Sequence, residues 1–504
     1  MAQGTFTGLA TANDAVKDGL RSLAYVTLTA PSTGKLSASV KIGGKTYTFT
    51  DTGYSFMSVD ASGTNVTAVL TQVQTIGSGK TKVVSTNELC CTVTDNCESN
   101  AANWRKEGTF TLKFPHLGYS SGTNVTDGVW YEGKLCRDNA KYNTGKANDA
   151  FVAEVSEFAG YYTVALANLN ALPGEPSGNG YVTMTLDAKG KAKFTGYLAD
   201  GTAYSASSVA AYLVGEGDET RLRVPLYACS ATSTKPYVFG GWLEFRLRDV
   251  KEVVGDKEST VKVPVVYANA PDTDLFWAND YALSTRDGEF GYQLALFPSG
   301  GWYDTVKNLQ AWYLYYDFTV SMPDKTDDLD ELAEALLDIG YEFAPRVALP
   351  DGQKVDLVGD KVSVEAQKLV KNADKFNDWN LSTNAANVKV NFTRATGIVS
   401  GTFDLWYEGY NAKNVFEQTT TLYKSLKHYG VFVPYRWDDG ILEDDVWTTG
   451  FFLAPQKDVP YEYYDVKTGT TTTKKRSWTG SYRFDIKATK AERDWSEAGN
   501  GGGE

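Results

Sequence analysis

Apolar and polar residues alternate with a period of two along much of the chain, as in β-strands that bury one face. Residues 108–114, 181–186 and 476–486 show this alternation clearly. Asp200-Gly201 is the strongest hairpin signal among the turns between such segments. Strand-like segments recur at about 8–12 residues, a spacing typical of a small antiparallel barrel or sandwich. The pattern therefore predicts an all-β protein.

One group of strands occurs twice. The sequence Tyr-Val-Thr-Leu-Thr at 25–29 returns as Tyr-Val-Thr-Met-Thr at 181–185, 156 positions later (25 to 181). Gly34-Lys35 returns as Gly190-Lys191 with the same offset, and Gly44 returns as Gly201 with one residue inserted. Two copies of one β-meander predict tandem barrel or sandwich modules, which are common parts of surfaces and assemblies.

We expect four regions. Residues 1–150 would form a β-domain with a cysteine-rich loop, and residues 151–325 a second β-domain, joined by a linker at 137–153. Residues 326–490 would complete the second unit, and residues 491–504 form a Gly-rich tail. One short helix is predicted near 327–339, because Asp328 can cap it, Gly340 can end it, and leucines recur on one side.

Composition narrows the range of functions. The 504 residues carry a net charge of −13, which argues against nucleic acids and anionic membranes as partners. No stretch of about 18 apolar residues is present, so we expect no membrane insertion. The first residues lack the regions of a signal peptide, and we interpret them as a start methionine placed before a mature secreted sequence.

The five cysteines suggest an oxidising compartment. Cys90, Cys91, Cys97 and Cys136 lie in one region, and we predict a disulfide from the first three to Cys136. Adjacent cysteines rarely bridge each other, so a Cys90–Cys91 bond is disfavoured. Cys229 has no partner nearby in the sequence and is expected to be a buried thiol.

An aromatic-rich stretch at 272–322 is the best ligand-binding candidate. Sugar rings stack on exposed Trp and Tyr side chains, and Trp302, Tyr303, Trp312 and Tyr315 could form such a platform. Because alternate residues of a strand point to opposite faces, half of these rings could instead belong to the core.

A cluster of carboxylates is a candidate calcium site. Asp438, Asp439, Asp444 and Asp445 flank a short loop, and Ca²⁺ prefers oxygen ligands. A solvated acidic loop, or the carboxylate pair of a glycoside hydrolase, are the alternatives. No other cofactor is indicated.

No catalytic residues are predicted. With only His116 and His428 available as histidine bases and no Gly-x-Ser-x-Gly sequence, a nucleophile–base pair is not indicated. Gly77-Ser78-Gly79-Lys80-Thr81 lacks the earlier glycine of a phosphate-binding loop, since position 74 is Gln.

Several segments together resemble a β-rich repeat of large secreted or surface proteins from planctomycete- and verrucomicrobia-like bacteria. The resemblance covers roughly 158–455, with a partial copy at 4–57. It is carried by residues 180–185, 193–202, 224–227, 241–245, 388–393, 396–403, 430–432 and 450–453. It implies a modular, non-catalytic protein outside the cell, and no site residues.

The sequence therefore favours a non-catalytic structural protein, extracellular or on a bacterial cell surface. Such a protein would assemble with itself or with other surface proteins as a fibre, layer or surface module. The alternative is a carbohydrate-binding or adhesive module that uses the aromatic stretch to contact glycans. A glycoside hydrolase is the third hypothesis.

Overall fold

The computed structural model describes much of the chain. The described residues are 4–12, 19–31, 35–50, 56–59, 65–76, 82–94, 107–115, 129–139, 148–169, 171, 175–215, 217–231, 236–254, 257–267, 275–279, 292–303, 317–321, 342–343, 367–371, 379–383, 389–393, 395–409, 419–434, 436–438, 441–443, 447–465 and 469–487. Most of these residues lie in strands of antiparallel sheets, and one short α-helix is present, so the predicted all-β class is confirmed.

Sheet A has nine strands in the order β4-β3-β2-β1-β9-β8-β7-β6-β5 and is nearly closed into a barrel, with β4 lying against β6. Phe49, Leu89, Phe110, Phe114 and Tyr131 are among the side chains that fill its interior. The strands are β1 (Gly4–Ala12), β2 (Leu23–Ala30), β3 (Ser37–Ile42), β4 (Lys45–Thr50), β5 (Phe56–Val59), β6 (Asn65–Ile76), β7 (Val83–Thr94), β8 (Glu107–Phe114) and β9 (Val129–Arg137).

Sheet C repeats this arrangement in the order β13-β12-β11-β10-β19-β17-β16-β15-β14, with β18 pairing β16 and β19. Tyr162, Phe194, Phe239, Phe245 and Trp277 are among its core residues. The strands are β10 (Gly160–Ala167), β11 (Gly180–Leu186), β12 (Lys191–Tyr197), β13 (Ala203–Ala210), β14 (Tyr212–Val214), β15 (Arg221–Ser230), β16 (Tyr237–Val254), β17 (Lys257–Val266), β18 (Leu275–Asn279) and β19 (Gln293–Trp302).

The two sheets also share their strand registers. Gly4 pairs with Ala30 in sheet A, and Gly160 pairs with Leu186 in sheet C, each 156 positions later. Ile42 pairs with Lys45 in sheet A and Tyr197 pairs with Ala203 in sheet C, so the one inserted residue lies in the turn between β12 and β13. The repeat thus extends over the whole nine-stranded sheet rather than one meander.

Sheet D contains a further copy of the central pairing. Its order is β21-β20-β30-β29-β26-β25-β24, so the first strand again lies between the second and the last. Phe6, Tyr162 and Phe318 of the three first strands are spaced by 156 residues each. The strands are β20 (Asp317–Ser321), β21 (Glu342–Phe343), β24 (Lys389–Thr393), β25 (Ile398–Gly409), β26 (Thr419–Val433), β29 (Trp447–Asp465) and β30 (Thr470–Lys487).

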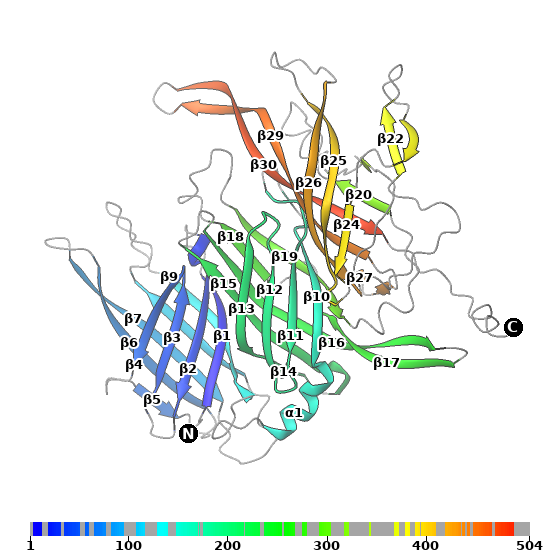
Figure 1. Cartoon of the computed structure of the whole chain (residues 1–504). Helices are drawn as coiled ribbons and strands as arrows, with labels where there is room; N and C mark the ends of the chain where they lie inside the picture. The colour runs from blue at the N-terminus through cyan, green and yellow to red at the C-terminus, as the bar shows by residue number, and fades with distance from the viewer. Residues whose placement is uncertain are drawn as a thin grey trace.

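Figure 1 shows the three sheets following one another in chain order, with sheet A at the left, sheet C in the centre and sheet D at the upper right. Two small hairpins pair β22 (Gln367–Lys371) with β23 (Trp379–Thr383), and β27 (Arg436–Asp438) with β28 (Ile441–Glu443). The described residues of 317–487 thus supply a sheet of their own, and none of their strands belongs to sheet C. The domain boundaries given above stay a prediction.

The described helices are α1 (Asp149–Val155) and the 3-10 turns Gly19–Arg21, Ser156–Phe158 and Gly217–Glu219. Helix α1 begins inside the predicted linker at 137–153, so residues 149–153 of that segment are helical. Asn148 caps the helix by accepting a hydrogen bond from the Phe151 backbone N–H, and Phe151 and Val155 are buried against Gly190. The helix predicted near 327–339 lies outside the described residues.

The predicted disulfide to Cys136 is not formed by Cys90 or Cys91. None of the four described cysteines, Cys90, Cys91, Cys136 and Cys229, is in a disulfide, and Cys97 lies outside the described residues. Strand β8 separates β7, which carries Cys90 and Cys91, from β9, which carries Cys136. Strands are about 4.8 Å apart, so this separation of about 10 Å exceeds the reach of a disulfide.

Candidate functional site

Arginines line the outer face of β15 and β16 in sheet C. Leu222 and Val224 point into the core, so the alternate residues Arg221 and Arg223 point outward. The antiparallel register places Arg223 opposite Glu244, and Arg221 opposite Arg246. The alternation along β15 places its arginines on the outer face of the sheet. The register between β15 and β16 then places Glu244 beside them.

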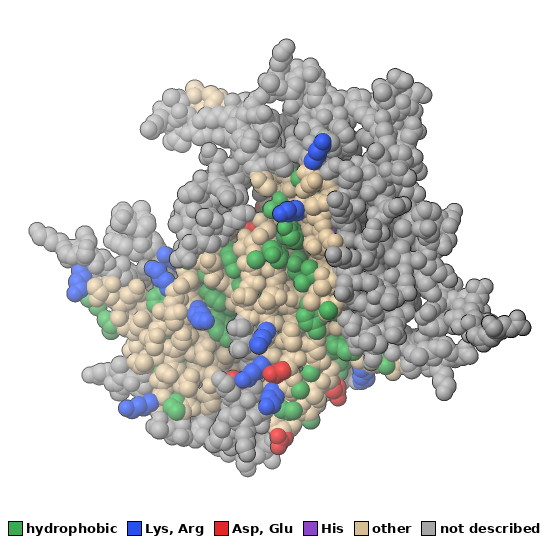
Figure 2. Space-filling model, viewed as in Figure 1, with side chains coloured by type: hydrophobic (Ala, Val, Ile, Leu, Met, Phe, Trp, Pro, Cys, Tyr) green, Lys and Arg blue, Asp and Glu red, His purple; other side chains and the backbone are tan. Residues whose placement is uncertain are grey.

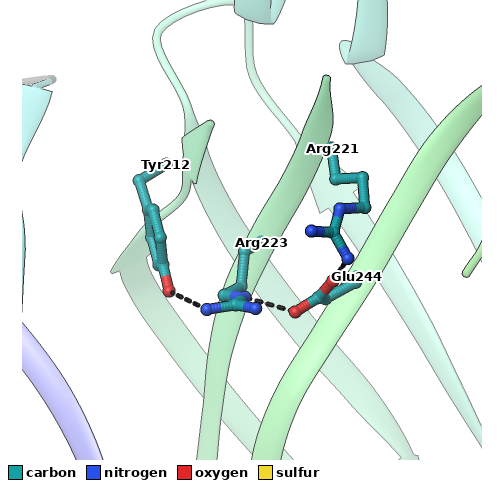
Figure 3. A network of polar contacts seen from close by, with 4 residues as sticks. All are labelled: Tyr212, Arg221, Arg223 and Glu244. Atoms are coloured by element: carbon teal, nitrogen blue, oxygen red, sulfur yellow. Dashed lines mark hydrogen bonds and ion pairs between the residues drawn. The ribbon is translucent and has the colours of Figure 1, made fainter. Parts of the chain in front are cut away.

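Glu244 is the centre of this polar network (Figure 3). Its carboxylate accepts from Arg221 Nη1 at 3.3 Å and from Arg223 Nε, and its side chain is only 8% exposed. Arg223 Nη1 also donates to the Tyr212 hydroxyl at 3.3 Å. One buried carboxylate therefore links neighbouring strands β15 and β16, and Arg223 extends the connection to β14.

Aromatic rings flank the guanidinium groups. The guanidinium carbon of Arg221 lies 5.0 Å from the centroid of the Tyr267 ring, and that of Arg246 lies 5.9 Å from the same ring. Arg223 lies 6.0 Å from the centroid of the Trp242 ring. Cation–π contacts of this kind add to the ion pairs and hold the planar guanidinium groups in place.

The network continues with a second ion pair. Arg246 Nη2 contacts Glu219 Oε1 at 2.8 Å, and the Glu219 side chain is 73% exposed. Burial and the neighbouring Arg246 charge lower the pKa of the Arg248 guanidinium. Arginine stays protonated in proteins, so these guanidinium groups can hold a carboxylate but cannot themselves act as general bases.

Sheets A and C meet at what we call the first junction: Leu9, Leu23 and Tyr25 against Tyr227, Val238 and Ala278. The Tyr25 and Tyr227 rings stack with centroids 5.8 Å apart. Burial raises the pKa of the Tyr25 hydroxyl to about 12, against the smaller effect of its hydrogen bond with Thr27. The contact is therefore desolvated.

Sheets C and D meet at the second junction: Ala165, Tyr181 and Tyr197 against Tyr429, Val431 and Val433. The Tyr197 and Tyr429 rings stack at 5.4 Å with an interplanar angle of 16°. Asn179 Nδ2 donates to Thr449 Oγ1 at 2.7 Å, and the Asn179 backbone N–H donates to the Gly450 carbonyl at 3.1 Å. The second junction thus combines apolar packing with buried hydrogen bonds.

The predicted aromatic platform is only partly within the described residues. Tyr303 is 3% exposed, and its ring packs edge-on against Tyr161 and Phe432. Trp302 is half-buried beside Gly160, where an added Cβ would lie 2.3 Å from the indole Nε1. Tyr303 therefore has no open ring face for a sugar, while Trp312 and Tyr315 lie outside the described residues.

Of the predicted calcium ligands, Asp438 is the last residue of β27. Asp439, Asp444 and Asp445 lie outside the described residues. In the part of the chain that the structure describes, no three His, Cys, Asp or Glu side chains are grouped as metal ligands would be. The same part contains no helix long and apolar enough to cross a membrane.

Sequence reasoning overlooked the arginine network. Arg221, Arg223 and Glu244 fall in segments that were recognised only as strands. The available signal was the pair of arginines at i and i+2 on a strand with an apolar core face. Comparison with family models, curated proteins and solved structures finds no match.

Proposed function

We propose that this chain is a non-catalytic structural protein that forms protein–protein assemblies outside the cell. The observation that carries the proposal is the repetition of one sheet architecture along the chain, with successive sheets joined through buried contacts. Sheet A is nearly closed, and sheets A and C each contain an apolar core of their own. A chain of such units is suited to extension, because each added unit needs only the surface of its neighbour.

The packed interiors of sheets A and C support the same proposal. Sheets A and C are filled by large apolar side chains, among them Phe110, Phe114, Phe194 and Trp277. A small barrel filled by side chains holds no ligand inside, so its outer surfaces carry the interactions. The Glu244 network supports rigidity, since it ties three strands of sheet C together on the outer face.

The location outside the cell rests on the resemblance to secreted and surface repeats and on the acidic, β-rich composition. The calcium site and the glycan-binding alternative rest on the sequence alone.

The test is the assembly state of the full chain. Sedimentation velocity over a wide concentration range, followed by negative-stain electron microscopy, should show ordered oligomers that lengthen with concentration. A chain that remains monomeric at the highest attainable concentration, with and without added calcium, would contradict the proposal.

A further inference from the structure

The two junctions use equivalent positions of the repeat. Leu9 and Tyr25 of sheet A correspond to Ala165 and Tyr181 of sheet C, each 156 positions later (9 to 165, 25 to 181). Both pairs lie on the first two strands of their sheet, opposite the residues that enter the core. We call this surface the donor face.

The surfaces that receive the donor faces share strands but not the position along them. The first lies beside the β15–β16 hairpin, and the second lies at the end of β25 and β26 away from their hairpin and reaches β29. Counted from the last strand of each sheet, the third and fourth strands are β16 and β15 in sheet C, and β26 and β25 in sheet D. The first junction places Tyr227 of β15 and Val238 of β16 against sheet A, and the second places Val431 of β26 and Ile398 of β25 against sheet C. We call this surface the acceptor face.

Each junction therefore joins two different faces, donor to acceptor. An interface of this head-to-tail type does not close on itself after one contact. Among the three sheets that the structure describes, the acceptor face of sheet A and the donor face of sheet D are not used in the two junctions. Sheet A comes first and retains its acceptor face, which is the outer surface of β6 and β7. Sheet D comes last, and its first strand is β20.

The acceptor face of sheet A is exposed. Ala68, Leu70, Leu89 and Cys91 point into the core, so the alternate residues of both strands form the outer surface. Among these, Val73 is 67% exposed and Val84 is 62% exposed, the two largest values among the exposed large hydrophobic side chains of the described residues. Figure 2 shows hydrophobic side chains at the left end of the described surface, where sheet A lies.

This surface is also almost uncharged. Its residues are Thr67, Val69, Thr71, Val73 and Thr75 on β6, and Val84, Thr86, Glu88, Cys90 and Thr92 on β7. Glu88 is the only charged one, and it is paired with Lys113 at 3.5 Å. A partner that covers two exposed valines and one paired charge desolvates few polar groups.

We propose that the outer face of β6 and β7 binds the first strand of sheet D, β20, from a second copy of the chain. The contact would repeat the donor side of both junctions and the acceptor side of the first junction, and would extend the row of sheets from one copy to the next. Position 321 of β20 corresponds to Leu9 and Ala165 (9 to 165 to 321) and carries a small uncharged residue, Ser321. The inference rests on the proposed function and names the surfaces that would mediate it.

The experiment uses full-length variants. Val73→Glu with Val84→Glu places two charges on the acceptor face. Leu169→Glu is the control, at a side chain that is 61% exposed in the turn after β10. We expect the double variant to raise the concentration for half-assembly at least about tenfold, with Leu169→Glu unchanged, because desolvating the charges opposes binding. Circular dichroism should show that both variants fold, since exposed positions tolerate substitution.

A mixing experiment tests the head-to-tail arrangement. Ser321→Glu should block the donor face while leaving the acceptor face intact. The Ser321→Glu variant alone, and the Val73→Glu/Val84→Glu variant alone, should remain monomeric. An equimolar mixture of these two variants should form dimers that grow no further, because each dimer has one blocked face at either end.

The outcomes separate the two proposals. Wild-type assembly that is unaffected by the Val73/Val84 substitutions, or a mixture that forms no dimers, would overturn this inference and leave the proposed function standing. A wild-type chain that never assembles would overturn both.

Discussion

Replacing Glu244 by Gln tests how far the buried ion network stabilises sheet C. The substitution keeps the side-chain shape and one acceptor oxygen but removes the charge that faces Arg221 and Arg223. Those two side chains are 29% and 11% exposed, so Arg223 in particular would be left with a poorly solvated charge. Breaking a buried pair by removing one partner costs about 3–5 kcal/mol.

The expected magnitude lies at or just below the lower limit of that range. Arg221 is partly solvated, and the Gln oxygen can still accept a hydrogen bond, so we expect a loss of about 2–3 kcal/mol in the free energy of unfolding of sheet C. For a unit of this size, each kcal/mol lowers Tm by roughly 2–4 °C. The apparent Tm should therefore fall by about 5–10 °C.

The assay is urea denaturation followed by tryptophan fluorescence, because guanidinium chloride would screen the ion pairs. Trp242 lies beside Arg223 and should report on this part of sheet C. Glu88→Gln is the control, since its pair with Lys113 in sheet A has side chains that are 41% and 62% exposed. Such an exposed pair should contribute about 0.5 kcal/mol or less.

A double substitution sharpens the reasoning. Glu244→Leu combined with Arg223→Met replaces a buried charge pair by apolar groups of similar size and should recover more than half of the lost stability. If Glu244→Gln proves no more destabilising than Glu88→Gln, the network does not stabilise the sheet and the electrostatic argument is refuted.

Three further predictions concern the junctions and sheet A. Asn179→Ala should cost about 1–3 kcal/mol, because it leaves buried Thr449 Oγ1 without this donor, and calorimetry should show the transitions of sheets C and D moving apart. The pKa of Tyr25 is raised to about 12 from an unfolded value of 10.0, so its contribution to stability is complete below about pH 10 and is lost as pH rises through about 12. Tyr25→Phe should accordingly reduce the loss of stability that urea titrations detect between about pH 9 and about pH 11. Gly133→Ala should destabilise sheet A by about 2–3 kcal/mol, since its Cβ would lie 2.2 Å from the Leu9 carbonyl oxygen; an unchanged Tm would contradict this.

Much of the strand content followed from the sequence. Residues 108–114 and 181–186 alternate strictly, and the structure places them in β8 and β11. In a strand with one buried face, apolar and polar residues alternate, so the strand can be predicted from its own residues without knowledge of its partners. The offset of 156 residues was likewise visible, because repeated units conserve the same inward and outward positions.

The short helix α1 could not be predicted from its local sequence. Helix α1 has seven residues, too few to be stable alone, and its cap at Asn148 is a common polar residue. Its stability comes from Phe151 and Val155 packing near Gly190, some forty positions along the chain. The sequence alone therefore supported a linker as readily as a helix.

The sequence by itself determined the class of structure, the inward face of many strands and the spacing of the repeat. Only the tertiary structure decided that the repeat spans whole sheets and that β20 of sheet D is equivalent to β1 and β10. The tertiary structure also decided that the Glu244 side chain lies between two arginines. Each of these depends on which distant strands pair and in which register. Alternation along one strand specifies which side chains are buried, but pairing joins residues that are far apart in the chain and have no local signature.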